Sequence, residues 1–337
     1  MMQVAHRLRR PHAGFTLVEL LVTISIIGIL ASMVLFALAG TQEASRRDRT
    51  RAQIARIDAL IAEKMESYET RRISAKVNRA TITDPIAGPE YSRSDPNPSR
   101  RRVYRIAATI SRVDGMRELM RIELPDRISD IMDPPVTLRT PPFLQRAYQN
   151  KAAKLLAKRK GGPVTGLPEI RNRWTRQYEG AECLYLILSQ MIDEEASALR
   201  YFSDTEIGDL DDDGMPEILD AWGSPIVFLR WAPGFASVGG YQDREAPDGL
   251  DPAGVYQEQA TFAIYPLIFS PGPDKLYEIN VGPDIRYGAL IPPNNPFFGM
   301  PPVYNQGNAV GIWIDVNNNG QNDSIDNIHN HLLIAGS

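Results

Sequence analysis

The chain has 337 residues, of which 43% are hydrophobic, so it is long enough and apolar enough to bury a substantial core. Its formal net charge of −4 is unevenly distributed, because residues 1–160 contain 29 Lys and Arg against 16 Asp and Glu, whereas the remainder contains 8 against 25. The basic charges are dispersed and accompany no nucleic-acid-binding motif, so nucleic acid is not expected as a partner.

An apolar run begins close to the N-terminus, and Glu19 is its one charged residue. Residues 15–39 have about the length that a helix needs to cross the hydrocarbon core of a membrane. An ionised carboxylate inside lipid is costly unless a cation pairs with it. The sequence therefore predicts a transmembrane helix in which Glu19 has a functional partner.

Two ordinary export signals fit this segment in part. A secretory signal peptide would end at Ala37-Leu38-Ala39, before Gly40, but its apolar region would exceed the usual length of about 7 to 15 residues. An uncleaved signal anchor would place Glu19 near the membrane interface, and it leaves the junction between Gly14 and Phe15 unexplained. Arginines flank the run on both sides, so charge counting does not decide its orientation.

A third interpretation depends on Gly14, Phe15 and the following Thr-Leu-Val-Glu-Leu, which a short basic leader precedes. This arrangement resembles the precursors of the type IV pilin superfamily. The resemblance implies that a prepilin peptidase cleaves after Gly14, that Phe15 is then N-methylated, and that Glu19 pairs with the α-amine of Phe15 on a neighbouring subunit. It also implies a single-pass inner-membrane protein with a periplasmic or extracellular body, and a secretion ATPase with platform proteins as partners.

The helical pattern continues beyond the membrane segment. One apolar stripe is formed at spacings of three and four residues by Ile54, Ile57, Ile61, Met65 and Tyr68. No proline interrupts residues 15–72. After a leader at residues 1–14, we therefore expect one helix over residues 15–72 whose second half packs on a globular domain.

Residues 73–203 are predicted to form a mostly helical insert with loops. A segment rich in Pro, Ser and Asp at residues 83–100 indicates an exposed loop. Helices are expected at about 101–123, 143–159 and 176–201. The last of these contains Cys183, the only cysteine, which excludes an intramolecular disulfide and is expected to be a small buried apolar residue.

Residues 209–220, DLDDDGMPEILD, have the spacing of an EF-hand-like calcium loop. In such a loop alternate oxygen-bearing side chains converge on one hard cation, a glycine at position six permits a sharp turn, and position twelve closes the coordination. Gly214 and Asp220 occupy these two positions, and Asp at position twelve instead of Glu resembles dockerin-type loops. The predicted ligands are Asp209, Asp211, Asp213, the carbonyl of Met215, and Asp220.

Residues 315–326, DVNNNGQNDSID, repeat this layout, with Gly320 at position six and Asp323 at position nine. The predicted ligands are Asp315, Asn317, Asn319, the carbonyl of Gln321, and Asp326. Asp, Asn and Gly also favour turns without any ion. Two independent matches to the full spacing nevertheless favour calcium as a cofactor, with one or two ions bound.

The C-terminal region, residues 204–337, is predicted to be rich in β-structure. Aromatic and β-branched residues with Pro-Gly punctuation predict antiparallel strands within 220–231, 260–279 and 309–316. The order of Asp-x-Trp-Gly-x-Pro, Phe-Ser-Pro-Gly-Pro-Asp and a late acidic loop is similar to that of the major pseudopilin of type II secretion systems. The resemblance implies a calcium site within Asp315 to Asp326, with Asp274 as a weaker candidate.

These elements predict an α+β fold in which a long N-terminal helix packs on a helical insert and a C-terminal antiparallel sheet. The expected function is that of a structural subunit in a pseudopilus or type IV pilus-like filament, built with other pilin-like subunits and serving type II protein secretion. No nucleophile and base occur together, so an enzyme is not expected. The alternative is a membrane-anchored or exported calcium-binding adhesive protein, for which the candidate residues are Trp231, Phe235, Phe297 and Phe298.

Overall fold

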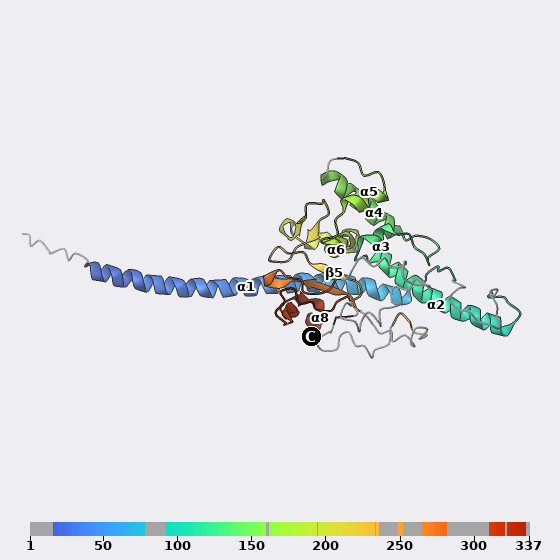
Figure 1. Ribbon diagram of the computed structural model, residues 1–337, viewed down its shortest axis with the longest axis horizontal. Helices are drawn as coiled ribbons and strands as arrows, with labels where there is room; N and C mark the ends of the chain where they lie inside the picture. The colour runs from blue at the N-terminus through green and yellow to red at the C-terminus, as the bar shows by residue number, and fades with distance from the viewer. Residues whose placement is uncertain are drawn as a thin grey trace, which may run out of the picture. The chain divides into compact units, whose positions relative to one another are not determined.

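A computed structural model describes the arrangement of the chain (Figure 1). It describes residues 16–77, 92–159, 162–193, 195–232, 234–235, 249–251, 265–281, 310–320 and 322–334. The chain divides into two compact units, Met1–Asp48 and Arg49–Ser337. The architecture confirms the predicted α+β class, because a long N-terminal helix is followed by further helices and small antiparallel sheets.

The predicted N-terminal helix is confirmed as α1, Leu17–Thr70, which contributes residues to both units. In the first unit, the large apolar residues between Leu17 and Leu38 are exposed along the helix. Among the described helices, α1 is the one that is long and apolar enough to cross a membrane by its length and composition.

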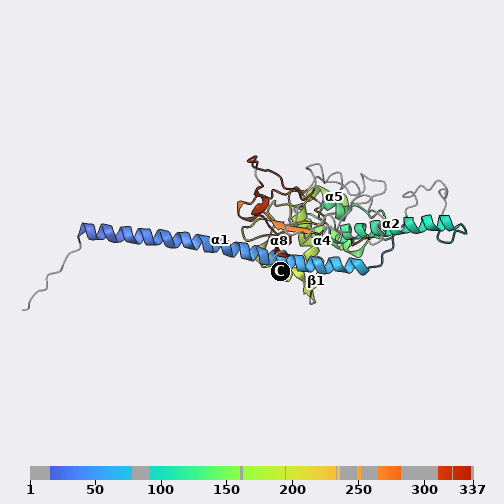
Figure 2. The same cartoon turned by 90° about the horizontal axis from the view of Figure 1, so that it is seen from below.

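In the second unit, α1 has the predicted apolar stripe. Ile54, Ile57, Ile61 and Tyr68 are at most 1% exposed, and Met65 packs against the same cluster. Figure 2 shows this light-blue part of α1 running along the other elements of the unit. The period of the stripe matches one face of a helix, so the sequence pattern and the buried face agree.

The helices after α1 agree with most of the predicted ones. They are α2 (Pro98–Glu123), α3 (Ile128–Met132), α4 (Phe143–Arg159), α5 (Leu167–Arg173), α6 (Glu179–Gln190) and, near the C-terminus, α8 (Asn330–Ile334). The predictions at 101–123 and 143–159 are confirmed by α2 and α4. Asn97 caps α2 with its side chain and Pro98 occupies the first helical position, which explains why this helix begins slightly earlier than predicted.

The prediction of one helix over 176–201 is wrong after Gln190. The chain there forms a hairpin of β1 (Ile192–Asp193) and β2 (Ala196–Ser197), followed by a short 3-10 turn. Glu195 in this hairpin has a φ of 70°, a left-handed conformation that a right-handed helix does not contain.

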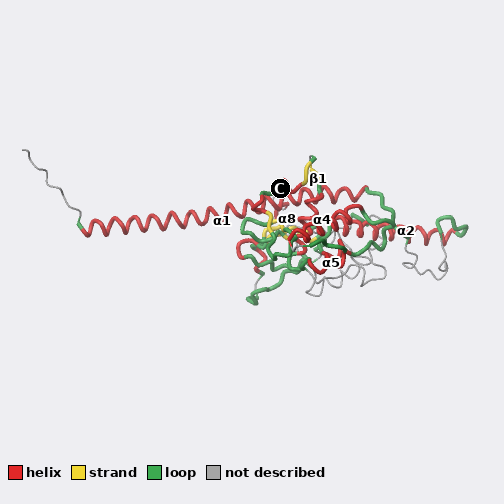
Figure 3. Tube along the Cα trace, turned by 90° about the horizontal axis from the view of Figure 1, so that it is seen from above, coloured by secondary structure: helices red, strands yellow, loops and turns green. Residues whose placement is uncertain are grey.

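Antiparallel pairing joins the described strands into small sheets. β1 pairs with β2, β3 (Ile207–Gly208) pairs with β4 (Glu217–Ile218), and a third sheet has the order β5-β6-β7. Its strands are β5 (Val227–Leu229), β6 (Leu267–Ser270) and β7 (Ile328–His329). Figure 3 shows how short these strands are beside the helices.

The predicted strands are longer than the observed ones. The segment 220–231 begins with a turn and contributes only β5. Within 260–279, β6 ends at Ser270, because Pro271 and Pro273 cannot donate to a strand ladder, and residues 260–264 lie outside the described part. Of the segment 309–316, the described residues form one bridge, between Trp313 and Ile279, since the positive φ of Gly311 interrupts the extended chain.

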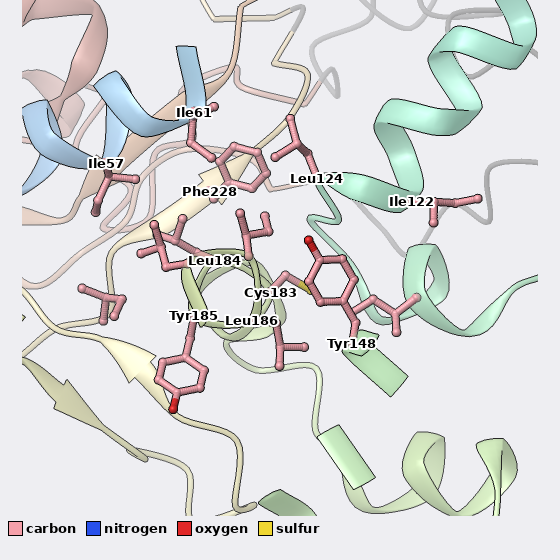
Figure 4. Packing of buried hydrophobic residues seen from close by; sticks show 14 of the residues in the cluster. Ile57, Ile61, Ile122, Leu124, Tyr148, Cys183, Leu184, Tyr185, Leu186 and Phe228 are labelled. Atoms are coloured by element: carbon pink, nitrogen blue, oxygen red, sulfur yellow. The ribbon is translucent and has the colours of Figure 1, made fainter. Parts of the chain in front are cut away.

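α6 contributes to the main hydrophobic core with buried residues on several of its faces. Figure 4 shows Cys183 of α6 beside Tyr148 of α4, and Phe228 of β5 beside Ile61 of α1. Cys183 is fully buried, as expected, and burial raises the pKa of its thiol well above the ordinary value. The predicted insert and the predicted β-rich region therefore share one core.

Candidate functional site

Thr16 and Glu19 form a capping box at the start of α1. Thr16 N and Thr16 Oγ1 each donate to Glu19 Oε2 at 2.9 Å, and Glu19 N donates to Thr16 Oγ1 at 3.2 Å. These bonds satisfy backbone donors that a helix start otherwise leaves open. Glu19 therefore has a local role beside its predicted pairing with the amine of Phe15, which lies with Gly14 outside the described residues.

The helix that follows presents apolar side chains in every direction. Ile26, Ile27, Ile29 and Leu30 fall within little more than one helical turn, and each is more than half exposed in the isolated chain. A helix that is apolar on all sides is suited to lipid or to a bundle of other helices. The first unit thus carries an unpartnered apolar surface in the region where the sequence predicts a membrane span.

The first acidic loop connects β3 to β4 and brings three predicted ligands together. One carboxylate oxygen from each of Asp209, Asp211 and Asp213 lies within 4.8 Å of the others. Gly214 N donates to Asp209 Oδ2 at 3.1 Å, and Asp213 N donates to Asp211 Oδ1 at 3.4 Å. Asp212 and Gly214 have φ angles of 66° and 107°, so the glycine at position six occupies a backbone conformation that favours glycine.

The second acidic loop repeats this local geometry. Gly320 N donates to Asp315 Oδ2 at 2.8 Å, and Asn319 N donates to Asn317 Oδ1 at 3.3 Å. Asn318 and Gly320 have φ angles of 56° and 74°, the same signs as at these positions in the first loop. The repeated sequence spacing therefore corresponds to a repeated turn conformation.

Asp220, the predicted closing ligand of the first loop, makes a different set of contacts. Its carboxylate accepts hydrogen bonds from Trp222 N and Ser224 N at 2.8 Å each, and from Ser270 Oγ at 2.6 Å. The chain leaves the loop as strand β4 and not as a helix. Asp220, at position twelve, therefore lies about 10 Å along an extended chain from Glu217, at position nine. Met215, at position seven, is fully buried.

Two glutamates that the sequence analysis did not select lie with the first loop. One carboxylate oxygen from each of Glu182, Asp211 and Glu217 lies within 4.8 Å of the others, and both glutamates are fully buried. Burial, reinforced by nearby carboxylates, raises the pKa of Glu182 to about 10 and that of Glu217 to about 8. Two features of the sequence could have pointed to these glutamates. Glu217 stands at position nine of the loop, and Glu182 is an acidic residue at the start of the apolar segment ECLYLIL.

Asp326, the predicted closing ligand of the second loop, groups with Asp274 and Glu278. One carboxylate oxygen from each lies within 4.8 Å of the others, and Glu278 is buried. The structure thereby brings Asp326 to Asp274, which the resemblance to the major pseudopilin implied as a weaker candidate, and it adds Glu278. These three carboxylates could hold a metal ion. Gln321, whose carbonyl is a predicted ligand of the second loop, lies outside the described residues.

Among the described residues, the aromatic side chains considered for adhesion do not form an exposed surface. Trp231 is 1% exposed and belongs to the main core. Phe235 makes edge contacts with His329 and His331, at centroid distances of 4.9 and 5.2 Å. Phe297 and Phe298 lie outside the described residues.

Residues 9–35 match the family model described as the prokaryotic N-terminal methylation motif. The match covers the Gly14-Phe15 junction, Glu19 and the first part of α1, and it indicates a type IV pilin-like prepilin leader. It supports a type IV pilin-like filament subunit and points to a structural subunit, not an enzyme. No curated protein and no solved structure matches the chain.

Proposed function

Proceeding from the N-terminal methylation motif, we propose that the chain is a structural subunit of a pseudopilus that serves type II protein secretion. The observation that carries this proposal is the motif at residues 9–35, followed by a helix whose apolar side chains are exposed on all sides. Such a helix needs lipid before assembly and neighbouring helices after it. The membrane supplies the first environment, and a filament in which these helices pack together supplies the second.

In the proposed pathway, the precursor inserts in the inner membrane in a single pass with its body in the periplasm. A prepilin peptidase cleaves after Gly14, and Phe15 becomes the methylated N-terminus. The amine of Phe15 then pairs with Glu19 of a neighbouring subunit, while a secretion ATPase and platform proteins extract the subunit from the membrane. Because desolvation offsets much of the attraction between buried charges, this pair sets the register of the subunits more than it stabilises them.

We further propose that calcium stabilises the body of the subunit at its acidic loops. Two observations support this: the two loops share one turn conformation, and carboxylates gather both at Asp209, Asp211 and Asp213 and at Asp274, Glu278 and Asp326. Calcium takes six to eight oxygen ligands and would neutralise these groups. Chelation is expected to lower the melting temperature and the protease resistance of the protein.

The intact mass and N-terminal sequence of the mature protein, isolated from its native membrane, test the processing route. We expect a chain that begins at Phe15 and carries one additional methyl group. A matched pair of variants locates the cleavage: Gly14→Val is expected to block it, and Ala39→Val is expected to leave it unchanged. A mature chain that begins at Gly40 would remove Glu19 from the mechanism and contradict the proposal.

Secretion assays separate the pseudopilus from a surface pilus. Deletion of the chain is expected to stop export of type II substrates, and mild shearing of cells is expected to release little of it. Normal export together with abundant sheared filaments would contradict the assignment to type II secretion, although it would still agree with a pilin-like filament subunit.

A further inference from the structure

A buried carboxylate from a separate helix lies beside the first acidic loop. Glu182 belongs to the first turn of α6 and is fully buried. Its Oε2 accepts a hydrogen bond from Trp174 Nε1 at 2.6 Å, whereas its Oε1 is buried without a hydrogen-bond partner. Buried polar atoms in folded proteins almost always have hydrogen-bond partners. The buried Glu182 Oε1 therefore indicates a ligand that the protein itself does not supply.

Glu217 shows the same arrangement from the strand side of the site. It lies in β4, fully buried, and its Oε2 accepts a hydrogen bond from Leu210 N at 3.1 Å. Its Oε1, like Asp209 Oδ1, is buried without a hydrogen-bond partner. Protein donors thus orient one oxygen of each glutamate and leave the other available.

Asp211 connects the two glutamates to the loop. It belongs to the group with Glu182 and Glu217 and also to the group with Asp209 and Asp213, so five carboxylates converge on one region. Arg159 approaches only one rim of this region, with its Nε 3.8 Å from Asp209 Oδ2 and half of its side chain exposed.

We propose that this region binds one calcium ion through Glu182 of α6, Glu217 of β4, and the loop residues Asp209, Asp211 and Asp213. Glu217, at position nine, takes the closing role that the loop spacing assigned to Asp220. Glu182 supplies a ligand from outside the loop, so the ion fastens the β3–β4 hairpin to a helix of the main core. Five carboxylates, completed by carbonyl or water oxygens, fit the ligand number and chemistry that calcium prefers.

This inference rests on the calcium binding proposed above but does not depend on the filament role. It differs from an EF-hand-like loop in one testable respect, which is the identity of the ligands beyond position five. A loop of the EF-hand type would lose affinity when Asp220 is changed, whereas the proposed site would lose affinity when Glu182 or Glu217 is changed.

The test uses full-length protein in detergent after treatment with EDTA. Calcium binding is measured by calorimetry, and terbium binding is measured by luminescence excited through tryptophan, because Trp174 is hydrogen-bonded to Glu182 and lies close enough to transfer energy. We expect Glu182→Gln and Glu217→Gln each to weaken calcium binding at this site at least tenfold. An Asp315→Asn background reduces the contribution of the second loop.

Matched variants show whether these effects are local. Asp212→Asn changes a largely exposed carboxylate in the same loop, and asparagine tolerates the left-handed backbone there, so calcium affinity is expected to stay within twofold. Trp174→Phe is expected to remove most of the terbium emission and to weaken calcium binding less than Glu182→Gln does, because it removes only the donor that orients Glu182 Oε2. Asp220→Asn is likewise expected to leave the affinity within threefold.

The melting temperature distinguishes a ligand from a merely structural residue. In EDTA, Glu182→Gln and Glu217→Gln are expected to melt no lower than wild type, because glutamine has the same shape as glutamate and keeps the oxygen that accepts from Trp174 Nε1 or Leu210 N. In calcium, they are expected to lose most of the increase that wild type shows. Unchanged calcium affinity in both variants, or melting below wild type in EDTA, would overturn the ligand assignment; a wild-type protein that binds no calcium would overturn the calcium proposal itself.

Discussion

Ser270 Oγ donates a hydrogen bond to Asp220 Oδ2 at 2.6 Å, and both residues are buried. This bond joins the segments Asp-x-Trp-Gly-x-Pro and Phe-Ser-Pro-Gly-Pro-Asp, since its two residues are 50 positions apart in the chain. Asp220 also closes the turn before β5 by accepting from Trp222 N and Ser224 N. Its carboxylate therefore connects this turn to the end of β6.

Asp220→Ala is predicted to lower the free energy of unfolding by about 3 kcal/mol, because it leaves two backbone donors and the Ser270 hydroxyl without their acceptor. Asp220→Asn keeps an acceptor oxygen and is expected to cost less than half as much. Denaturant unfolding in detergent measures both values. Equal losses for the two variants would show that the charge, and not the hydrogen bonding, is what matters.

Gly272 is predicted to be more sensitive to substitution than Gly223, although both have positive φ angles, 73° and 81°. A Cβ at Gly272 would lie 2.8 Å from the backbone oxygen of Asp326, whereas nothing lies within 4 Å of one at Gly223. Gly272→Ala is therefore expected to cost about 2 kcal/mol more than Gly223→Ala, which bears backbone strain alone. Thermal unfolding of the two variants measures the difference, and equal melting temperatures would contradict the close contact.

Glu123→Gln is predicted to loosen the end of α1 from the end of α2. Arg71 donates to both carboxylate oxygens of Glu123 at 2.7 and 2.8 Å, and Lys64 Nζ lies 2.7 Å away. Burial alone raises the pKa of Glu123, but the hydrogen bonds from Arg71 and Lys64 outweigh it and hold the pKa below its ordinary value. We expect a loss of about 2 kcal/mol, since Arg71 is partly exposed.

Hydrogen exchange of the amides in residues 60–72 checks this prediction, because protection there is expected to fall before that of α6. Glu66→Gln, which changes an exposed carboxylate on the same helix, is the control and is expected to have no effect. Uniform loss of protection across the second unit would show that Glu123 supports the whole core and not the end of α1.

Periodicity predicted the helices better than composition predicted the strands. The stripe of Ile54, Ile57 and Ile61 identified the buried face of α1, because apolar residues spaced three and four apart fall on one face of a helix and not on one face of a strand. The predicted strand segments were chosen for their aromatic and β-branched residues, and this criterion did not treat the prolines and glycines inside them as strand ends. Pro271 and the left-handed Gly311 decide those limits.

The candidate cation sites were predictable only within each loop. Spacing selected Asp209, Asp211 and Asp213, because those residues are near in sequence and a short turn brings them together. Glu182 reaches the same region from α6, and no local pattern records a contact between segments so far apart. Asp220 was selected by its position twelve in the loop spacing alone, whereas strand β4 carries the chain away from the other carboxylates.

Stability is predicted to fall as the pH decreases from about 6.5 to about 4, in part because of His329 and His331. Burial lowers the pKa of both imidazoles to about 4, so between these values the unfolded chain binds protons that the folded chain does not. In this range each histidine lowers the free energy of unfolding by up to about 1.4 kcal/mol for each pH unit of acidification. Above pH 6.5 neither state is protonated there and the slope disappears.

The comparison is made between wild type and His331→Gln at each pH, because buried carboxylates act in the opposite direction. Burial raises the pKa of Asp126 to about 6, so its protonation favours the folded state as the pH falls. In His331→Gln the slope is expected to decrease, and the pKa of His329 is expected to rise because a neighbouring positive charge is removed. Parallel stability curves for the two proteins would refute the assignment to this histidine pair.

Glu19→Gln is predicted to reduce filament incorporation at least tenfold, and this variant separates the two roles of Glu19. A glutamine can keep the capping box with Thr16, because its side-chain oxygen still accepts from Thr16 N and Oγ1. It cannot form an ion pair with the methylated amine of Phe15. Incorporation is measured as the fraction of protein that sediments with filaments when the variant and wild type are produced together.

Thr16→Ala is the matched variant, because it removes the cap hydroxyl and keeps the charge of Glu19. The loss of an N-cap side chain costs about 1 kcal/mol of helix stability, which a helix held in lipid or among other helices can bear. We therefore expect Thr16→Ala to assemble and Glu19→Gln to remain in the membrane fraction. If instead Glu19→Gln assembles and Thr16→Ala does not, the carboxylate acts as a helix cap, and subunit register must come from the apolar faces of α1.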